Sequence, residues 1–323
     1  MKAIRIEQTG GPSVMRLVDI ELGSPMDGEI RVRHTAIGLN YIDTYHRSGL
    51  YPQPMPSGIG QEAAGVVEDV GQGVRSLKVG DRIAYGTGPI GAYSEARNIA
   101  ANRVIKIPKS ISDETAAGMM LKGMTARYLL RAVYKVKRGE TILLHAAAGG
   151  VGQILSQWAK ALGVQVIGTV GSAGKMGAAR DHGCAHVINS AEEDVVARVK
   201  EITGGKGVPV VYDGVGQATL MTSLDCLSPR GLLVSFGNAS GPVKAFDLGL
   251  LASKGSLYVT RPMLGSFTRS EADLKETAGD VVEIVKSGKV KIPVNQRYAL
   301  ADAVKAHEDL EARRTTGATV LIP

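Results

Sequence analysis

The sequence predicts an α/β protein in which a doubly wound parallel sheet is inserted into a β-rich domain. Three observations support this prediction. Strand-like and helix-like segments alternate from residue 123 to residue 264, the pattern of a doubly wound sheet. Before them, residues 1–120 contain short segments with near period-two alternation, such as "EIRVRHTAIGL", between glycines and prolines. After them the chain mixes helices and strands again, so we expect the tail to rejoin the first domain.

Each helix and strand predicted in residues 123–264 has its own signal in the sequence. The strands are short, mainly apolar segments, and the helices end at glycines. In chain order the predicted elements are strand "TILLHAA", helix "VGQILSQWAKALG", strand "VQVIGTV", helix "GKMGAARDHG", strand "HVINS", helix "AEEDVVARVKEITGG", strand "VPVVYDGVG", helix "QATLMTSLDCLSPRG", strand "LLVSFG" and strand "SLYVT". In the tail we expect a helix over "SEADLKETAGDVVEIVKSGKV", then strand "NQRYAL", helix "ADAVKAHEDLEAR" and strand "GATVLIP".

Composition narrows the class of protein. The chain has 323 residues, 44% of them hydrophobic, enough for about two domains with their own cores. It has no apolar signal segment and no run long enough to cross a membrane. Cys184 and Cys226 are the only cysteines, so we expect reduced thiols in a cytoplasmic protein. The net charge is +7, but the basic residues are scattered and no nucleic-acid-binding motif is present, so a nucleic-acid partner is not expected.

A glycine-rich turn in "LLHAAAGGVG" predicts a dinucleotide site. Against the G-x-G-x-x-G pattern it has Ala147, Gly149 and Gly152, between a strand and a helix. The second glycine allows the backbone to approach a pyrophosphate, and the third allows the helix to pack closely on the strand. The pyrophosphate is expected at the helix N-terminus, near the amides of Gly150 and Val151.

The second strand of the sheet favours NADPH over NADH. An NAD site usually has an acidic residue about 20 residues after the turn, which binds the ribose 2′-hydroxyl. Here no Asp or Glu occurs between Thr141 and Arg180. Instead "TVGSAGK" places Ser172 and Lys175 after the strand. A hydroxyl and a cation suit a 2′-phosphate, which an acidic residue would repel.

Motifs along the whole chain resemble those of the zinc-free quinone oxidoreductases, relatives of zeta-crystallin in the medium-chain dehydrogenase/reductase superfamily. They are "GLNYIDTYHRSGLYP", "GQEAAGVV", "VGDRIAY", "GAYSE", "KGMTA", "HAAAGGVGQILSQWAKALG", "VINS", "VVYDGVG", "LVSFGNASGPV" and "ATVLIP". The resemblance implies a GroES-like catalytic domain at 1–122, joined by residues 265–323, and a Rossmann NADPH-binding domain at 123–264. It also implies a cleft between the domains, where NADPH and a quinone meet, and a homodimer with sheets joined across the subunit boundary.

The resemblance also implies a site without metal. Zinc-dependent relatives carry Cys near the place of Asn40 and Gly-His-Glu where this chain has Gly60, Gln61 and Glu62, and no third thiolate candidate lies near Lys122. Zinc needs three or four suitably spaced ligands. Reduction of a quinone does not need the Lewis acid that alcohol oxidation uses.

Residue roles follow from the resemblance, position by position. Asn40 and Thr125 would border the nicotinamide ribose, and Arg313 would reach the cofactor from the tail. Relatives that select NADPH commonly have Tyr at Ser190, a departure that weakens the 2′-phosphate pocket. The full set of implied cofactor-binding residues is Asn40, Thr125, Gly149, Gly150, Val151, Ser172, Lys175, Ser190, Gly216, Phe236, Gly237, Asn238, Val259, Thr260, Arg261 and Arg313.

The expected chemistry is hydride transfer from NADPH to a quinone. Negative charge develops on the quinone oxygen, so a hydrogen-bond donor should stabilise it. Tyr45 is the first candidate, followed by Asn40 and Tyr51. His46 is less favoured as a general acid, and Asp43 is expected to bond local amides. Two alternatives stay open: an NADPH-dependent enone or alkenal (C=C) reductase of the same superfamily, and a non-catalytic NADPH- or RNA-binding protein.

Overall fold

The computed structural model describes residues 1–323, which form two compact units. The β-rich unit comprises Met1–Met124, Phe267–Lys286 and Ile292–Pro323. The parallel-sheet unit comprises Thr125–Ser266 and Ser287–Lys291. Both ends of the chain therefore belong to the β-rich unit.

The parallel-sheet unit has six strands in the order β11-β10-β9-β12-β13-β14, and every neighbouring pair is parallel. This order is that of a dinucleotide-binding doubly wound sheet, in which the order of the strands reverses beside the first strand. Its strands are β9 Thr141–Leu144, β10 Gln165–Val170, β11 His186–Asn189, β12 Val208–Asp213, β13 Leu227–Ser235 and β14 Tyr258–Thr260. Its helices are α3 Gly150–Ala161, α4 Met176–Asp181, α5 Val195–Ile202, α6 Leu220–Asp225, α7 Gly249–Ser253 and α8 Leu264–Phe267, with helical turns at Leu129–Val133 and Ala173–Lys175.

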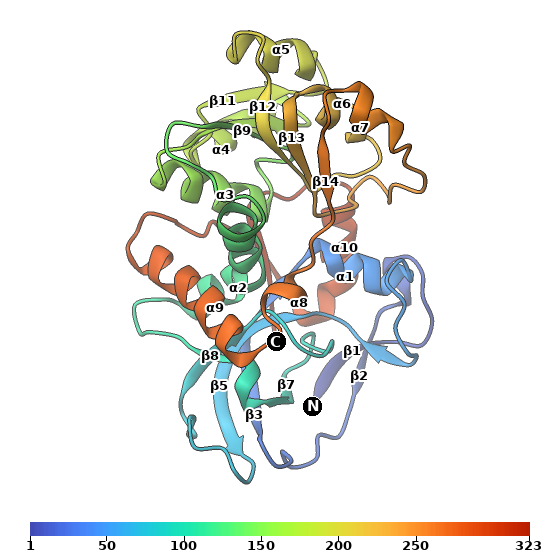
Figure 1. Ribbon diagram of the computed structural model, residues 1–323. Coiled ribbons are helices and arrows are strands. Elements are labelled where there is room, and N and C mark those ends of the chain that lie inside the picture. Colours follow the sequence, from blue (N-terminus) through green and yellow to red (C-terminus); the bar gives the residue numbers. More distant parts are fainter. The chain divides into compact units, whose positions relative to one another are not determined.

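Helices cover both faces of this sheet (Figure 1). One face has a core in which Val199 of α5 and Leu224 of α6 pack against Leu143, Ile167 and Val211 of the central strands. Because the strands are buried on both faces, their sequences are nearly continuous apolar runs, as expected for a parallel sheet.

The β-rich unit is organised around the long strand β3, Glu29–Leu39, which pairs with β5, β7 and β16. The larger sheet has the order β15-β16-β3-β5-β6-β8, and the smaller one has the order β2-β1-β4. The remaining strands are β1 Lys2–Ile6, β2 Arg16–Asp19, β4 Ser57–Gly58, β5 Glu62–Val70, β6 Arg82–Tyr85, β7 Ala96–Ala100, β8 Ile105–Lys106, β15 Val294–Ala299 and β16 Ala318–Ile322. The helices are α1 Tyr41–Ser48, α2 Asp113–Tyr128, α9 Glu271–Lys286 and α10 Ala303–Glu311, with short turns at Pro12–Val14, Ala101–Arg103 and Leu300–Asp302.

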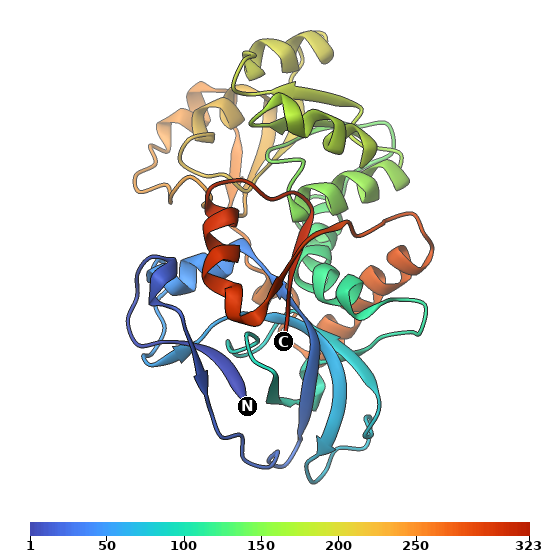
Figure 2. The ribbon, with the colours of Figure 1, turned by 180° about the vertical axis from the view of Figure 1, so that it is seen from behind.

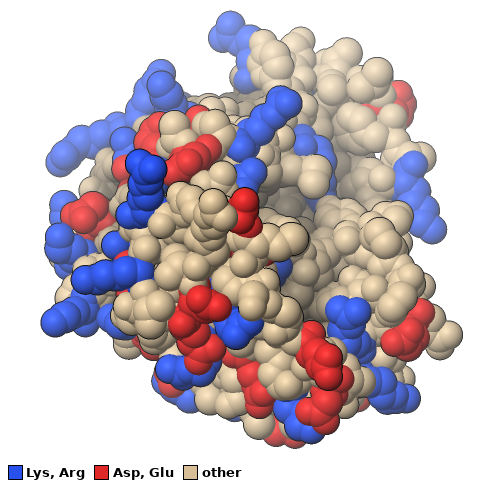
Figure 3. All heavy atoms as spheres, turned by 90° about the horizontal axis from the view of Figure 1, so that it is seen from below, with Lys and Arg blue, Asp and Glu red and all other residues tan.

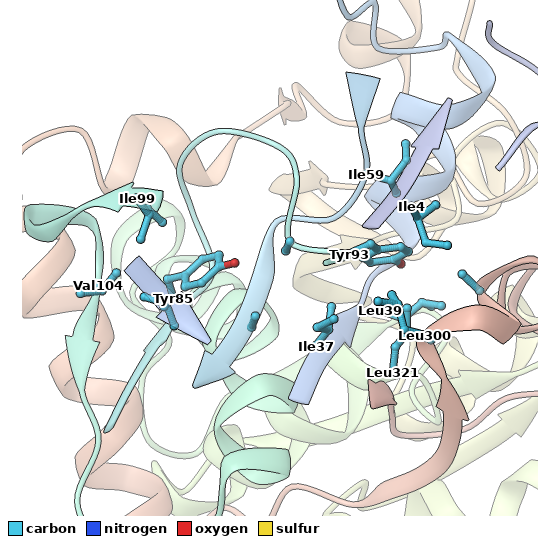
Figure 4. Packing of buried hydrophobic residues seen from close by; sticks show 14 of the residues in the cluster. Ile4, Ile37, Leu39, Ile59, Tyr85, Tyr93, Ile99, Val104, Leu300 and Leu321 are labelled. Carbon is cyan, nitrogen blue, oxygen red and sulfur yellow. The ribbon is translucent and has the colours of Figure 1, made fainter. Parts of the chain in front are cut away.

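One core joins the two ends of the chain within this unit. Ile37 and Leu39 of β3 share a buried cluster with Leu300 and with Leu321 of β16. Figure 4 shows these side chains beside Tyr93, whose ring lies inside the cluster. Residues from the tail and from β3 therefore share one buried cluster.

Two helices interrupt the region that the sequence predicts as short strands. Helix α1 begins after Asn40, whose backbone N–H donates to the Asp43 carboxylate at 2.9 Å, and it ends at Gly49 with a φ of 81°. These are ordinary start and stop signals, but they enclose only eight residues. The second helix, α2, follows Ser112, whose hydroxyl accepts from the Thr115 N–H at 3.2 Å.

The predicted helix "QATLMTSLDCLSPRG" is too long. The structure ends α6 at Asp225 and begins β13 at Leu227. Leu227 pairs with Val208 of β12, and Arg230 has a φ of 61°, which is incompatible with a helix interior. Strand pairing, which is not visible in a local pattern, therefore decides this boundary.

Charged side chains are interspersed on the face of the molecule shown in Figure 3, where Lys and Arg lie among Asp and Glu. Such mixing matches the scattered basic residues of the sequence and differs from a single-sign nucleic-acid surface. No helix combines the length and the hydropathy that crossing a bilayer requires.

Candidate active site

The glycine turn lies where the sequence predicts it, at the carboxyl end of β9. Gly149 is the N-cap of α3, and Gly150 and Val151 open the helix. A Cβ at Gly152 would lie 2.5 Å from the carbonyl oxygen of Ala146 and 2.6 Å from that of Ala147. Helix and turn are thus in backbone contact, and the N–H groups of the first helical turn suit a pyrophosphate.

The end of the second strand carries the residues expected near a 2′-phosphate. Ser172 is exposed and Lys175 is half-buried, in the helical turn that follows β10. Ser190 is brought to the same strand end, since its N–H and its hydroxyl both donate to the carbonyl of Val170, at 2.9 and 3.1 Å. The Ser190 hydroxyl is therefore engaged with the backbone.

The loops after β12, β13 and β14 form one cluster. Gly216 has a φ of 96°, and a Cβ there would meet the Gly241 carbonyl at 2.7 Å and the Asn238 Cα at 3.3 Å. The Arg261 guanidinium donates to the carbonyls of Ser235 and Gly237 at 3.0 and 2.8 Å. Phe236, which precedes Gly237, lies over Gly214, where a Cβ would come within 3.0 Å of its ring. This part of the predicted site is therefore assembled within the parallel-sheet unit.

A buried hydrogen-bond network lies at the base of these loops. The Asp213 carboxylate, at the end of β12, accepts hydrogen bonds from Val215 N at 2.8 Å, Gly216 N at 3.0 Å, Thr219 Oγ1 at 2.7 Å and Ser223 Oγ at 2.7 Å. Because the Ser223 hydroxyl donates to Asp213, its oxygen must accept from His145 Nε2 at 3.0 Å, which leaves Nδ1 to accept from Thr169 Oγ1 at 2.9 Å. Burial lowers the pKa of His145, consistent with this neutral ring. The network links the ends of β9, β10 and β12, where the loops that follow these strands begin.

In the β-rich unit Asn40 belongs to a buried charged cluster. Its Nδ2 donates to Glu62 Oε2 at 2.8 Å and lies 3.4 Å from the Gly38 carbonyl. Glu62 is fully buried; its Oε2 also accepts from Lys122 Nζ at 2.9 Å and its Oε1 accepts from Leu121 N at 2.8 Å. No group of three or more His, Cys, Asp or Glu side chains in the structure is arranged to hold a metal ion.

Helix α1 presents the candidate tyrosines. Tyr45 is 7% exposed, and its ring contacts those of Tyr41 and Tyr51, with centroids at 5.6 and 5.2 Å. Tyr51 follows the helix and donates its N–H to the Tyr45 carbonyl at 3.0 Å. Burial lowers the pKa of His46 to about 4, so its ring is neutral at pH 7 and is poorly suited to the general-acid role.

A second buried network fixes α1 against α10, which lie side by side (Figure 2). The Tyr93 hydroxyl donates to Asp43 Oδ2 at 2.9 Å and accepts from His307 Nε2 at 3.1 Å. Arg47 donates to His307 Nδ1 at 2.9 Å and pairs with Glu311 at 2.7 Å. Asp43 and Arg47 are one helical turn apart on α1, as are His307 and Glu311 on α10, so matched faces hold the two helices together.

Burial raises the pKa of Asp43 to about 7, although hydrogen bonds from Asn40 N and Tyr93 lower it in part. Relative to an ordinary carboxyl near 3.8, this group stabilises the fold below pH 4 and loses that contribution as the pH rises through 7. We expect the stability of the wild type relative to Asp43→Asn to decrease between pH 4 and pH 8. Thermal unfolding of both proteins across this range measures it, and the buried histidines cancel in the difference. A difference that is independent of pH would contradict the raised pKa.

The remaining sequence-predicted residues lie in α2, in β14 and after α10. Thr125 is buried in α2, and Val259 and Thr260 belong to edge strand β14. Arg313 lies in the β-rich unit, just after α10, with a φ of 58°. Sequence reasoning missed Glu62 as a partner of Asn40, as well as Lys122, His145 and Asp213. The signal for the pair Glu62 and Lys122 was a charged residue inside an apolar stretch, in "QEAAGVV" and "MMLKGM", which usually means a buried ion pair.

A doubly wound sheet with a glycine turn at the N-terminus of its first helix is the architecture of a dinucleotide-binding unit, and in the chain it interrupts a β-rich unit to which both ends belong. Comparisons with known families agree: residues 26–109 match the alcohol dehydrogenase GroES-like domain and residues 150–283 match the zinc-binding dehydrogenase family. The chain belongs to the quinone oxidoreductases of the medium-chain dehydrogenase/reductase superfamily.

Individual relatives match over nearly their full length. The quinone oxidoreductase of Pseudomonas aeruginosa is 55% identical over 100% of this chain and 99% of its own. The crystal structure of Escherichia coli quinone oxidoreductase complexed with NADPH is 51% identical, has a TM-score of 0.98 and is covered over 100% of both chains. A 2-haloacrylate reductase of a Burkholderia species is 45% identical over 98% of both chains.

Proposed function

We propose that the protein reduces quinones with NADPH and without a metal ion. The observation that carries this proposal is the similarity to quinone oxidoreductases over the entire chain, at 55% identity to one of them. The donor set supports the metal-free part, because Asn40, Gln61 and Lys122 provide neither thiolate nor imidazole, the ligands that zinc prefers.

The parallel-sheet unit would hold the cofactor. The α3 N-terminus binds the pyrophosphate through its free N–H groups, and the contact between α3 and the turn leaves backbone, not side chain, at this surface. Lys175 and Ser172 bind the 2′-phosphate, and the loops around Gly216 and Asn238 border the nicotinamide end. When bound, NADPH supplies the hydride, and the protein supplies orientation and electrostatics.

A tyrosine hydroxyl is the best donor for the acceptor oxygen. The two hydrogens of the Asn40 amide face Glu62 and the Gly38 carbonyl, so this side chain has no hydrogen left to donate. Tyr45 therefore takes the role, with Tyr51 beside it.

Replacement of Tyr45 by phenylalanine is expected to lower kcat for quinones by roughly 10-fold or more, since a donor to developing negative charge is lost. The ring packing is kept, so Tm should change little. Steady-state kinetics at saturating NADPH measures the effect, and Tyr134→Phe, in the other unit, is the control. An unchanged kcat would assign Tyr45 to packing alone.

The deciding assay follows oxidation of NADPH and of NADH with an ortho-quinone, a para-quinone and an alkenal. Turnover with quinones and preference for NADPH support the proposal. Turnover only with the alkenal would instead favour C=C reduction. This is the second candidate function, because a 2-haloacrylate reductase is 45% identical to this chain. NADPH binding without any turnover would favour the non-catalytic alternative.

A homodimer formed through the edge of the parallel sheet belongs to the same proposal. Strand β14 pairs only with β13, and an unpaired edge is a template for pairing with another copy. Large apolar side chains are exposed along or near it: Tyr258 at 61%, Val259 at 39%, Met263 at 61% and Leu248 at 73%. Such a patch supports an interface between copies.

Tyr258→Lys is expected to convert the dimer to a monomer, because a charge on an edge strand opposes pairing. Sedimentation velocity measures the mass, and Leu17→Lys, on an exposed position of β2, is the matched control. A monomeric wild type, or a dimer that survives Tyr258→Lys, would contradict this interface.

The free, buried thiols of Cys184 and Cys226 support a cytoplasmic location, where thiols stay reduced.

A further inference from the structure

The pair formed by Glu62 and Lys122 has no assigned role, although it is among the most buried charges of the β-rich unit. The exposed fractions of the two side chains are 0% and 7%. A buried ion pair is costly to desolvate and can often be replaced by apolar residues without loss of stability. Its presence beside Asn40 therefore needs an explanation other than stability.

The hydrogen bonds give that explanation. Both oxygens of the Glu62 carboxylate accept hydrogen bonds, Oε1 from the Leu121 N–H at 2.8 Å and Oε2 from Lys122 Nζ at 2.9 Å. Asn40 must therefore turn its Nδ2 toward Glu62, at 2.8 Å. The amide cannot flip, because a flipped amide would place its oxygen against the carboxylate. Glu62 thus decides which end of the Asn40 amide faces away from the pair.

The end that faces away is an acceptor without a donor. Asn40 is 4% exposed, and its Oδ1 is buried. The Asp43 N–H of the capping box donates to the backbone carbonyl of Asn40 at 3.0 Å, which leaves Oδ1 without a hydrogen bond of its own. Such an acceptor costs on the order of 1–3 kcal/mol, and unsatisfied groups of this kind call for a specific explanation. A ligand that brings an O–H group to Oδ1 would remove this cost.

We propose that Glu62, paired with Lys122, is a positioning residue that orients Asn40 so that its Oδ1 accepts a hydrogen bond from a ligand hydroxyl. The hydroxyl belongs either to a ribose of the dinucleotide or to the hydroquinone product. This inference rests on the proposed function and reverses the role first expected for Asn40: toward the ligand, Asn40 accepts a hydrogen bond and does not donate one.

A double-mutant cycle of Glu62→Gln and Asn40→Ala tests the inference. In Glu62→Gln the introduced amide can turn its NH₂ group toward Asn40, which then flips. Each single change should weaken binding of the hydroxyl ligand by about 10-fold, and the double variant should be no weaker than Asn40→Ala alone, because Glu62 acts only through Asn40. If the two losses of ligand affinity multiply in the double variant, the inference is wrong. It is also wrong if Glu62→Gln binds the hydroxyl ligand as tightly as the wild type does.

Two readouts identify the hydroxyl. Weaker NADPH binding without quinone, followed by NADPH fluorescence, assigns it to the dinucleotide. Unchanged NADPH binding with a raised inhibition constant for the hydroquinone assigns it to the product. The wild type's turnover of quinones tests the proposed function separately, so the two can fail independently.

A second variant separates orientation from stability. Glu62→Gln leaves the Lys122 charge buried without its partner, whereas Glu62→Gln with Lys122→Met removes both charges. The double variant should regain Tm but keep the weakened ligand binding. Recovery of both would assign the pair to stability and overturn the inference. Asp309→Asn is the matched control, since that carboxylate also accepts several hydrogen bonds, from Tyr298, Lys305 and Arg314, but has no link to Asn40.

Discussion

Replacement of Gly152 by valine is expected to weaken NADPH binding strongly. A Cβ at this position would lie 2.5 and 2.6 Å from two backbone carbonyl oxygens of the turn, and backbone cannot move aside as a flexible side chain can. Helix α3 must therefore shift away from β9, and the pyrophosphate loses its N–H donors. We expect a loss of roughly 100-fold in affinity, about 2.7 kcal/mol, and a lower Tm from overpacking.

NADPH fluorescence titration measures this affinity, and circular dichroism confirms that the variant is folded. Gly279→Ala is the matched control: this glycine also lies in a helix, α9, but a Cβ there meets nothing within 4 Å. The control should gain about 0.5–1 kcal/mol of stability and keep its affinity for NADPH. Normal NADPH binding by Gly152→Val would mean that the cofactor does not lie on this turn.

Replacement of Lys175 by alanine is expected to raise the KM for NADPH by about 10-fold or more and to leave the KM for NADH unchanged. The reason is the loss of a charge-assisted hydrogen bond to the 2′-phosphate, typically about 1.5–3 kcal/mol. No carboxylate lies between Thr141 and Arg180 to bind the free 2′-hydroxyl of NADH. The affinity for NADH should therefore not change.

The control for this prediction is Lys160→Ala, a lysine in the last turn of α3, away from the strand ends that carry the site. It changes the net charge equally and should leave both KM values unchanged. Equal effects of Lys175→Ala on the two cofactors would remove the 2′-phosphate assignment. Ser190, with its hydroxyl bonded to Val170, is expected to contribute little to this preference.

The parallel-sheet unit was largely predictable from sequence. Most of its strands are short apolar runs, and the glycine turn marks the first strand of the sheet. The error at "CLSPRG" arose because Leu227 is strand only through its pairing with Val208. Helix α1 was missed for a related reason: five of its eight residues are buried, and all of these except Tyr45 are polar, so no apolar stripe marks its buried face.

Within the candidate site, the sequence predicted residues at turns but not their partners. Gly149, Ser172 and Lys175 could be placed because they follow strands, and the ends of parallel strands meet at one edge of a sheet. Glu62 and Lys122 could not be paired, because they are 60 residues apart in the chain. The same holds for His145 and Ser223, separated by 78 residues.

The sequence by itself determined the alternation of strands and helices, the glycine turn and the absence of an acidic residue after β10, since each depends on a short stretch of chain. Only the tertiary structure decided the orientation of the Asn40 amide, the neutral state of His145 and the attachment of α1 to α10. These depend on which charges and hydrogen-bond donors become neighbours after folding. Burial then makes each such choice costly to reverse, because an unpaired polar group away from water is destabilising.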